Sequence, residues 1–366
     1  MSFLNASRLA MAVRTASWRV LMILPLLSAS VLNAQQDVTL NIAATDQYSQ
    51  GYEGNQNVYS AEDSGFWFLS TQYSPQTFNR DCPRFVPQVQ RFENCQGFRC
   101  SSFHEMTSSL VPGIPVCIMV HGSFVDLPSA CNESAETWRW LKSGSMGHQM
   151  QMIYFNWPSY KRILPTVQVE VNMLGRRAAR NGYYLAELIQ HIPPECPICL
   201  IGHSHGTRVI AGGLHLMAGG TLQGIGHPWA RSNGRHIRTV FVASALDRDW
   251  LNPGQKYDRA LCSTSCVLNM RNELDPALAI YPMRLPLISK GAIGYKGLSS
   301  RDRMALGCRS QQVIEYDVTQ VIGRSHLWPY YFTNPGLSRA MHNYVYFPDV
   351  VQPVTLSQQA SNVEVR

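Results

Sequence analysis

The chain has 366 residues, of which 45% are hydrophobic and 15% are charged, a composition typical of a folded globular protein rather than a disordered one. Its formal net charge is +7, but the basic residues form no run of Lys and Arg with interleaved aromatic residues. We therefore expect no nucleic acid partner.

The first 34 residues have the pattern of an export signal. Three arginines precede an apolar run at 20–32, and Asn33 and Ala34 come before a polar stretch. This run is shorter than the about 20 residues that a membrane-spanning helix needs. We expect cleavage after Ala34, export to the periplasm or the medium, and no stable membrane span in the mature chain.

All ten cysteines follow this segment. In an exported chain an even number of cysteines suggests disulfides, although the sequence leaves their connectivity open. Cys117 and Cys199 lie in apolar runs, where buried free thiols are equally consistent. Cys196 and Cys199 have the C-x-x-C spacing of zinc and redox sites. A zinc site would need a second pair of ligands, and a redox site would need a helix after the first cysteine, where a strand is predicted here. A structural disulfide or inert thiols are favoured there.

The predicted elements begin after residues 35–64, which are polar, lack periodicity and are predicted to form an N-terminal arm. Residues 66–71 predict a first strand, and 89–107 alternate like a strand with a turn. A helix is predicted between Val167 and Ile192, where apolar residues recur at spacings of three, four and seven. Short continuous apolar runs suit strands that are buried on both faces. They occur at 116–120, 152–155, 198–201, 240–243, 266–270 and 313–318.

This alternation predicts an α/β fold with a mostly parallel sheet of roughly eight strands, helices on both faces and right-handed crossovers. The chain shows no internal repeat and no long linker, so we expect one domain over 65–350 and a C-terminal tail at 351–366. Residues 280–306 would form either a cap over the site or a crossover helix with its loops, and we favour the second.

Two predicted strands end in sequences that carry chemistry. Residues 121–124 read H-G-S-F, and 202–206 read G-H-S-H-G directly before a predicted helix. Parallel sheets bind ligands beyond the carboxyl ends of their strands. G-x-S-x-G between a strand and a helix is the nucleophile elbow, whose glycines make room for a strained, exposed serine. The motif predicts Ser204 as a nucleophile.

A serine hydroxyl needs a base, and the base needs an acid that fixes its tautomer. The elbow predicts the chain order serine, acid, histidine. Asp275 follows a late strand and His326 follows the last one, so they are the expected acid and base. The reserve acids are Asp247 and Asp249, with Glu273 less favoured.

The tetrahedral intermediate of such a reaction needs two preorganised backbone donors. We expect one from the amide of His205 and the other from Ser123 or Phe124. The side chains of His203 and His205 are then expected to be incidental neighbours. This chemistry uses no cofactor.

These features resemble the α/β-hydrolase superfamily and, more narrowly, a bacterial branch of exported proteins with esterase-like and lipase-like sequences. The resemblance covers residues 66–345 and rests on F-W-F-L-S-T-Q, I-P-V-C-I-M-V-H-G, F-N-W-P-S, I-G-H-S-H-G and N-E-L-D-P-A-L. It implies an α/β-hydrolase fold and a mechanism with Ser204, Asp275 and His326 as nucleophile, acid and base. The histidine after the serine and the number of cysteines depart from the pattern.

The resemblance does not define the substrate. A small or medium acyl ester is expected, and thioesterase or peptidase activity stays open, as does the oligomeric state. One alternative treats His203 and His205 as metal ligands, although zinc would need further ligands and the flanking glycines would have no purpose. Another is a hydrolase fold that binds a ligand without turnover.

Overall fold

The computed structural model describes residues 65–77, 83–94, 96–160, 167–228, 234–281 and 290–351. The predicted signal, the N-terminal arm and the tail beyond residue 351 lie outside the described residues. Among the described helices, none is both long and apolar enough to cross a membrane.

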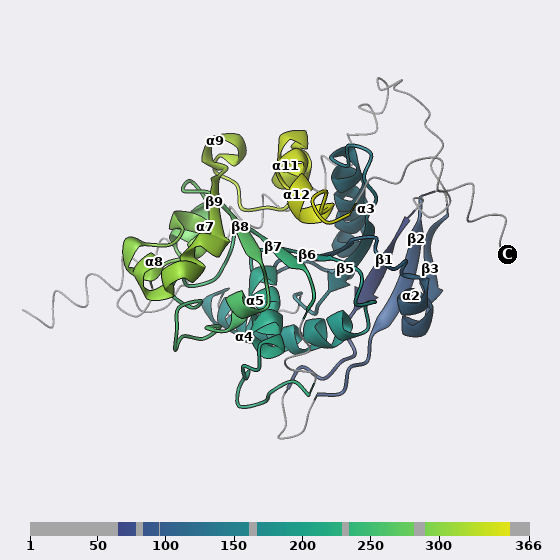
Figure 1. The fold of residues 1–366 in the computed structure, drawn as a ribbon, viewed down its shortest axis with the longest axis horizontal. Coiled ribbons are helices and arrows are strands. Elements are labelled where there is room, and N and C mark those ends of the chain that lie inside the picture. The colour runs from purple at the N-terminus through teal and green to yellow at the C-terminus, as the bar shows by residue number, and fades with distance from the viewer. Residues whose placement is uncertain are drawn as a thin grey trace, which may run out of the picture. The chain divides into compact units, whose positions relative to one another are not determined.

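A mixed sheet of nine strands runs through the described residues, in the order β3-β2-β1-β5-β4-β6-β7-β8-β9 (Figure 1). β1 pairs antiparallel with β2 and β2 with β3, whereas every other pair is parallel. The predicted mostly parallel sheet is confirmed, with one strand more than expected. The strands are β1 (Gly65–Ser70), β2 (Gln88–Glu93), β3 (Gly97–Ser101), β4 (Val116–Val120), β5 (Gln151–Asn156), β6 (Ile198–His203), β7 (Ile237–Val242), β8 (Cys266–Arg271) and β9 (Val313–Asp317).

Helices cover both faces of this sheet, as predicted. In Figure 1, α4 (Val167–Gln190) and α5 (Gly206–Met217) lie below the sheet, and α3 (Leu127–Ser143), α11 (Pro335–Ala340) and α12 (His342–Val345) lie above it. Shorter helices complete the described chain. They are α2 (Phe103–Ser109), η3 (Ala260–Cys262), α6 (Pro276–Ala279), α7 (Ile293–Lys296), α8 (Ser300–Leu306), η4 (Gly307–Gln312), α9 (Thr319–Ile322) and α10 (Pro329–Phe332).

The residues of the central strands divide between two cores. In β4, Val116, Ile118 and Val120 belong to the core between the sheet and helices α4 and α5. Cys117 and Met119 belong to the core on the other face, between the sheet and helices α3 and α12. All five side chains are fully buried. Burial on both faces explains why this strand reads as a continuous apolar run instead of an alternating one.

The strand prediction over 89–107 is wrong from Ser102 onward. The structure ends β3 at Ser101 and begins α2 at Phe103. The hydroxyl of Ser102 accepts a hydrogen bond from the amide of Glu105 at 2.9 Å, which caps the helix. A Ser with Glu three residues later is a helix-start signal, and here it overrides the alternation.

Residues 290–306 form α7 and α8 between β8 and β9, while 282–289 lie outside the described residues.

The strand order changes direction at β4, with β5 on one side and β6 on the other. α3 follows β4 on one face and α5 follows β6 on the opposite face. Val120 pairs with Gly202, so the segments that follow β4 and β6 start side by side. Such a switch point is where open parallel sheets place their ligands.

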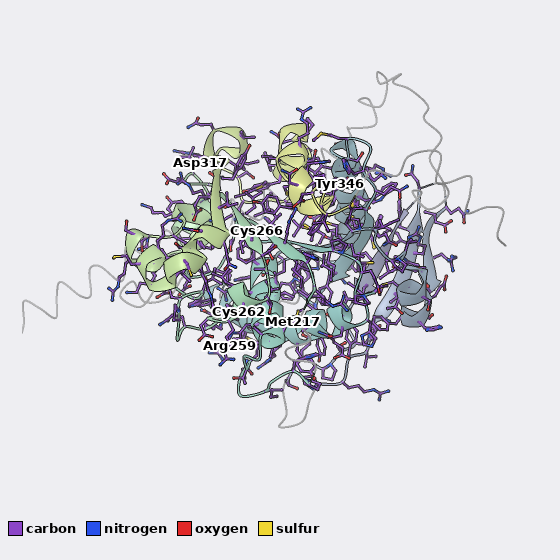
Figure 2. All side chains as sticks on the ribbon, viewed as in Figure 1. Met217, Arg259, Cys262, Cys266, Asp317 and Tyr346 are labelled. Atoms are coloured by element: carbon purple, nitrogen blue, oxygen red, sulfur yellow. The ribbon has the colours of Figure 1, made fainter. Side chains whose placement is uncertain are left out.

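The eight cysteines that the structure describes all carry free thiols, and Cys82 and Cys95 lie outside the described residues. Cys196 and Cys199 are therefore not a disulfide. Cys117 and Cys199 are neighbours on β4 and β6, and burial raises the pKa of the Cys199 thiol. Cys262 and Cys266, labelled in Figure 2, are also unpaired with each other. The described cysteines thus do not meet the expectation of disulfides.

Candidate active site

Ser204 occupies a strained turn between β6 and α5. Its φ is +51°, in the left-handed region that side-chain-bearing residues rarely adopt. It comes one residue after the end of β6 and two residues before α5. A strained serine at a strand-to-helix turn is the geometry of the nucleophile elbow. Together with the sheet topology, this turn identifies the α/β-hydrolase fold.

The glycines of the motif are required by the close approach of other backbone. A Cβ on Gly206 would collide with the carbonyl oxygen of Val120 and lie 2.7 Å from that of His121. A Cβ on Gly202 would lie 2.9 Å from the amide nitrogen of Thr207. Backbone atoms cannot move aside as a flexible side chain can, so both positions exclude larger residues.

Gly206→Ala is expected to lower the free energy of unfolding by about 3 kcal/mol, because the methyl group must displace β4 backbone. A urea titration measures this change. Gly226→Ala is the matched control, since the nearest atom to its Cβ is 3.9 Å away, and it should change stability by less than about 0.5 kcal/mol. Equal effects of the two variants would contradict the steric role of Gly206.

His326 lies between Ser204 and Asp275. Its Nε2 is 2.9 Å from Oγ of Ser204, and its Nδ1 is 2.6 Å from Oδ2 of Asp275. Asp275 is fully buried and Ser204 is 7% exposed. The structure therefore brings the three predicted side chains into one hydrogen-bonded chain, although they come from three separate loops.

Asp275 is held by a second set of hydrogen bonds. It is the N-cap of α6, and its Oδ1 accepts from the amides of Ala277 and Leu278 at 2.9 and 3.0 Å. Pro276, at the first helical position, lacks an amide donor and suits this turn. The cap uses one carboxylate oxygen and leaves the other directed at His326.

Asp247 and Glu273 have partners other than His326, and among the described residues no hydrogen bond or ion pair joins Asp249 to the His326 ring. Asp247 accepts from the hydroxyl of Tyr281 at 2.9 Å, and Glu273 pairs with Arg271. Within the described part of the chain, the carboxylate of Asp275 is the one hydrogen-bonded to the His326 ring. The structure thus separates Asp275 from the other acids that the sequence left open.

The loop after β4 is held by residues 156–159, the F-N-W-P-S segment of the sequence. Nε1 of Trp157 donates to the carbonyl of His121 at 2.8 Å, and Oδ1 of Asn156 lies 2.9 Å from Nε2 of His121. The amide of Phe124 donates to the carbonyl of Ser159 at 3.1 Å. Of the two amides expected to face an oxyanion, that of Phe124 is therefore already engaged, which leaves Ser123 as the candidate.

The side chain of His203 contacts the loop that carries His326. Its Nε2 lies 2.7 Å from the carbonyl oxygen of His326, and because a carbonyl can only accept, this nitrogen carries the proton. Burial, followed by the nearby His326, lowers the pKa of His203 to about 3, so the ring is neutral. His203 therefore helps to position the predicted base.

The side chain of His205 makes a contact of its own, with the loop after β4. Its Nδ1 lies 2.6 Å from Oγ of Ser123. The expectation that His203 and His205 are incidental neighbours is therefore wrong, because each side chain contacts a different loop from the elbow.

The described residues contain no group of three or more His, Cys, Asp and Glu side chains arranged to hold a metal ion.

Asn272 is a further residue of the site, and no motif in the sequence predicted it. Its Nδ2 donates to the carbonyls of Gly323 and Ser325 at 2.8 and 3.2 Å, and its Oδ1 accepts from the amide of Leu274 at 3.0 Å. The side chain thus joins the loop of Asp275 to the loop of His326. Its position directly after β8 could have predicted it as a site residue, since polar groups at the ends of parallel strands lie together at one sheet edge.

Acid is expected to destabilise the fold through His121 and His203. Burial lowers the pKa of His121 to about 4 and that of His203 to about 3, from an ordinary 6.5. Below about pH 6.5 the unfolded chain therefore binds protons that the folded chain does not. Their contribution to the free energy of unfolding is fully present above that pH. It is lost as the pH falls toward the pKa values of the folded state, by about 1.4 kcal/mol per pH unit for each histidine.

Urea titrations between about pH 7 and about pH 5 measure this dependence. His203→Gln should have a shallower acid slope than the wild type because one buried titrating group is gone. His104→Gln, which removes an exposed histidine, should keep the wild-type slope. The same slope in all three proteins would contradict the assignment.

Neither a protein-family model nor a curated protein sequence matches the chain. The solved structures that are similar to it include three esterases, each with 11% sequence identity. A mutant of the esterase rPPE has a TM-score of 0.35 over 74% of this chain and 80% of that one. Carboxyl esterase 2 from the mycorrhizal fungus Tuber melanosporum has a TM-score of 0.38 over 82% and 91%. A thermostable esterase from Pseudomonas putida has a TM-score of 0.35 over 75% and 81%.

Proposed function

We propose that the protein is an exported serine hydrolase that cleaves carboxylic esters through an acyl-enzyme intermediate. The hydrogen-bonded chain from Asp275 through His326 to Ser204, at 2.6 and 2.9 Å, carries the proposal. A nucleophile beside a base that is itself oriented by a third group is the arrangement that activates a hydroxyl.

In the first half of the proposed reaction, Oγ of Ser204 attacks the ester carbonyl carbon. The hydroxyl proton moves to Nε2 of His326. Asp275 keeps the other ring proton on Nδ1, so that the lone pair of Nε2 faces the serine, and its carboxylate stabilises the imidazolium that forms.

The carbonyl oxygen becomes an oxyanion at this stage and needs donors that are already in place. The backbone amides of His205 and Ser123 supply them in this proposal. Each such donor is worth about 3 kcal/mol of barrier. The start of α5 at Gly206 adds a favourable helix dipole.

The first half ends when the imidazolium of His326 gives its proton to the leaving alkoxide oxygen, the alcohol departs and the acyl group stays on Oγ of Ser204. Deacylation is the second half. Water then attacks the acyl carbon while Nε2 takes one of its protons. The intermediate collapses, Ser204 recovers its proton, and the carboxylic acid is released. A small or medium acyl ester is the proposed substrate class.

A fluorophosphonate probe tests the proposal, because it attaches covalently only to an activated serine. Wild type should gain one probe mass by intact-protein mass spectrometry, and Ser204→Ala should gain none. If neither folded protein is labelled, the serine is not activated and binding without turnover becomes the better account. Ester hydrolysis should also persist in the presence of a chelator, and its loss would favour the metal alternative.

A further inference from the structure

Ser123 joins two parts of the proposed oxyanion site. Its amide is one candidate donor, and its Oγ lies 2.6 Å from Nδ1 of His205, the residue whose amide is the other. The loop also abuts the nucleophile, since a Cβ on Gly122 would lie 3.1 Å from Cβ of Ser204. Ser123 is only partly buried, unlike Gly122 and His205 on either side of the contact.

The surroundings of His205 decide which ring nitrogen carries its proton. The residue is 4% exposed, and its Nε2 has no hydrogen-bond partner among the described residues. A Cβ on Gly175 would lie 3.6 Å from this nitrogen and would collide with Nη1 of Arg208, so the guanidinium lies on the Nε2 side of the ring. A buried N–H without an acceptor is unfavourable, because it has lost its hydrogen bonds to water and gained none in the protein. A lone pair facing a cation is favourable instead, which places the proton on Nδ1.

This tautomer determines what the hydroxyl of Ser123 can do. Burial, followed by the charge of Arg208, lowers the pKa of His205 well below its ordinary value, so the ring has a single proton. Its Nδ1–H then donates to Oγ of Ser123. The hydroxyl hydrogen of Ser123 is left to point elsewhere, and accepting a hydrogen bond makes this O–H a stronger donor.

We propose that the hydroxyl of Ser123 is a third hydrogen-bond donor to the oxyanion, and that the side chain of His205 orients it. The inference rests on the proposed ester hydrolysis. Ser123 would contact the reacting oxygen directly and is a catalytic residue in this scheme. His205 acts through Ser123 and is a positioning residue, which gives the second histidine of G-H-S-H-G a role.

The test compares Ser123→Ala with wild type in steady-state ester hydrolysis. Loss of one oxyanion donor is expected to lower kcat by about 100-fold, with KM nearly unchanged because the interaction forms only in the transition state. The affinity for a trifluoromethyl ketone, which forms a tetrahedral oxyanion on the serine, should fall by a similar factor. Ser123→Thr keeps the hydroxyl and should recover most of the lost kcat.

Two further variants separate orientation from packing. His205→Asn keeps an amide donor near the place of Nδ1 and should retain more kcat than His205→Leu, which has none. Ser129→Ala, at an exposed serine of α3, is the matched control and should behave as wild type. Should Ser123→Ala fail to fold, Ser123→Cys, with its weak S–H donor, replaces it and should lower kcat and ketone affinity together.

An unchanged kcat in Ser123→Ala, or a lower kcat with undiminished affinity for the ketone, would overturn this inference. Either result leaves the proposed function intact as long as wild type hydrolyses the ester and is labelled at Ser204. If wild type neither turns over an ester nor reacts with the fluorophosphonate, the proposed function itself fails, and this inference fails with it.

Discussion

Ser204→Ala is expected to lower kcat for a reactive ester by about 10⁶-fold, the scale of effect found when a triad serine is removed. The variant lacks the oxygen that attacks the carbonyl carbon and becomes acylated. The oxyanion donors and the binding surface remain, so a residual rate enhancement over water of about 10³-fold to about 10⁴-fold should persist. Only the proton-accepting Nε2 of His326 loses its partner.

The fold should tolerate this change, because alanine at position 204 faces the same backbone strain as serine at φ +51°. Initial rates at saturating ester, together with a urea titration, measure activity and stability on the same preparation. Ser134→Ala is the matched control at another buried serine, one whose hydroxyl donates to the carbonyl of Cys131 at 2.7 Å. A Ser204→Ala protein that retains a tenth or more of the wild-type kcat would exclude this serine as the nucleophile.

Asp275→Asn is expected to lower kcat by about 10⁴-fold while leaving the protein folded. The two oxygens of Asp275 have separate partners, so an amide can keep Oδ1 on the amides of Ala277 and Leu278. Its NH₂ group then takes the place of Oδ2 and donates to Nδ1 of His326. The ring proton is forced onto Nε2, and the nitrogen that faces Ser204 can no longer accept the hydroxyl proton.

Asp275→Ala removes the helix cap as well as the acid. It should therefore be less stable than Asp275→Asn by about 1 kcal/mol, with a similar loss of kcat. Asp247→Asn is the control at a buried acid that bonds Tyr281 instead of His326, and its kcat should stay close to the wild-type value. A large loss in Asp247→Asn with little loss in Asp275→Asn would reverse the assignment of the acid.

Continuous apolar runs in the sequence predicted the strands around the site well, because these strands are buried on both faces. β4 and β6 are buried on both faces, and such strands leave continuous apolar runs that the sequence displays directly. The two glycines around Ser204 reflect backbone contacts that allow no side chain. In a parallel sheet, the carboxyl ends of β6, β8 and β9 meet at one edge, which is why the sequence alone predicts Ser204, Asp275 and His326 as neighbours.

The fold class and a short list of candidate residues at one sheet edge thus follow from local patterns in the amino-acid sequence. The three-dimensional contacts were needed to show that Asp275 lies beside His326 and that the amide of Phe124 is engaged. They also show which loops the side chains of His203 and His205 contact. Those contacts join residues 35, 51, 82 and 123 positions apart. Hydrogen bonds of this kind depend on how loops meet above the sheet, and neither residue spacing nor local propensity encodes that geometry.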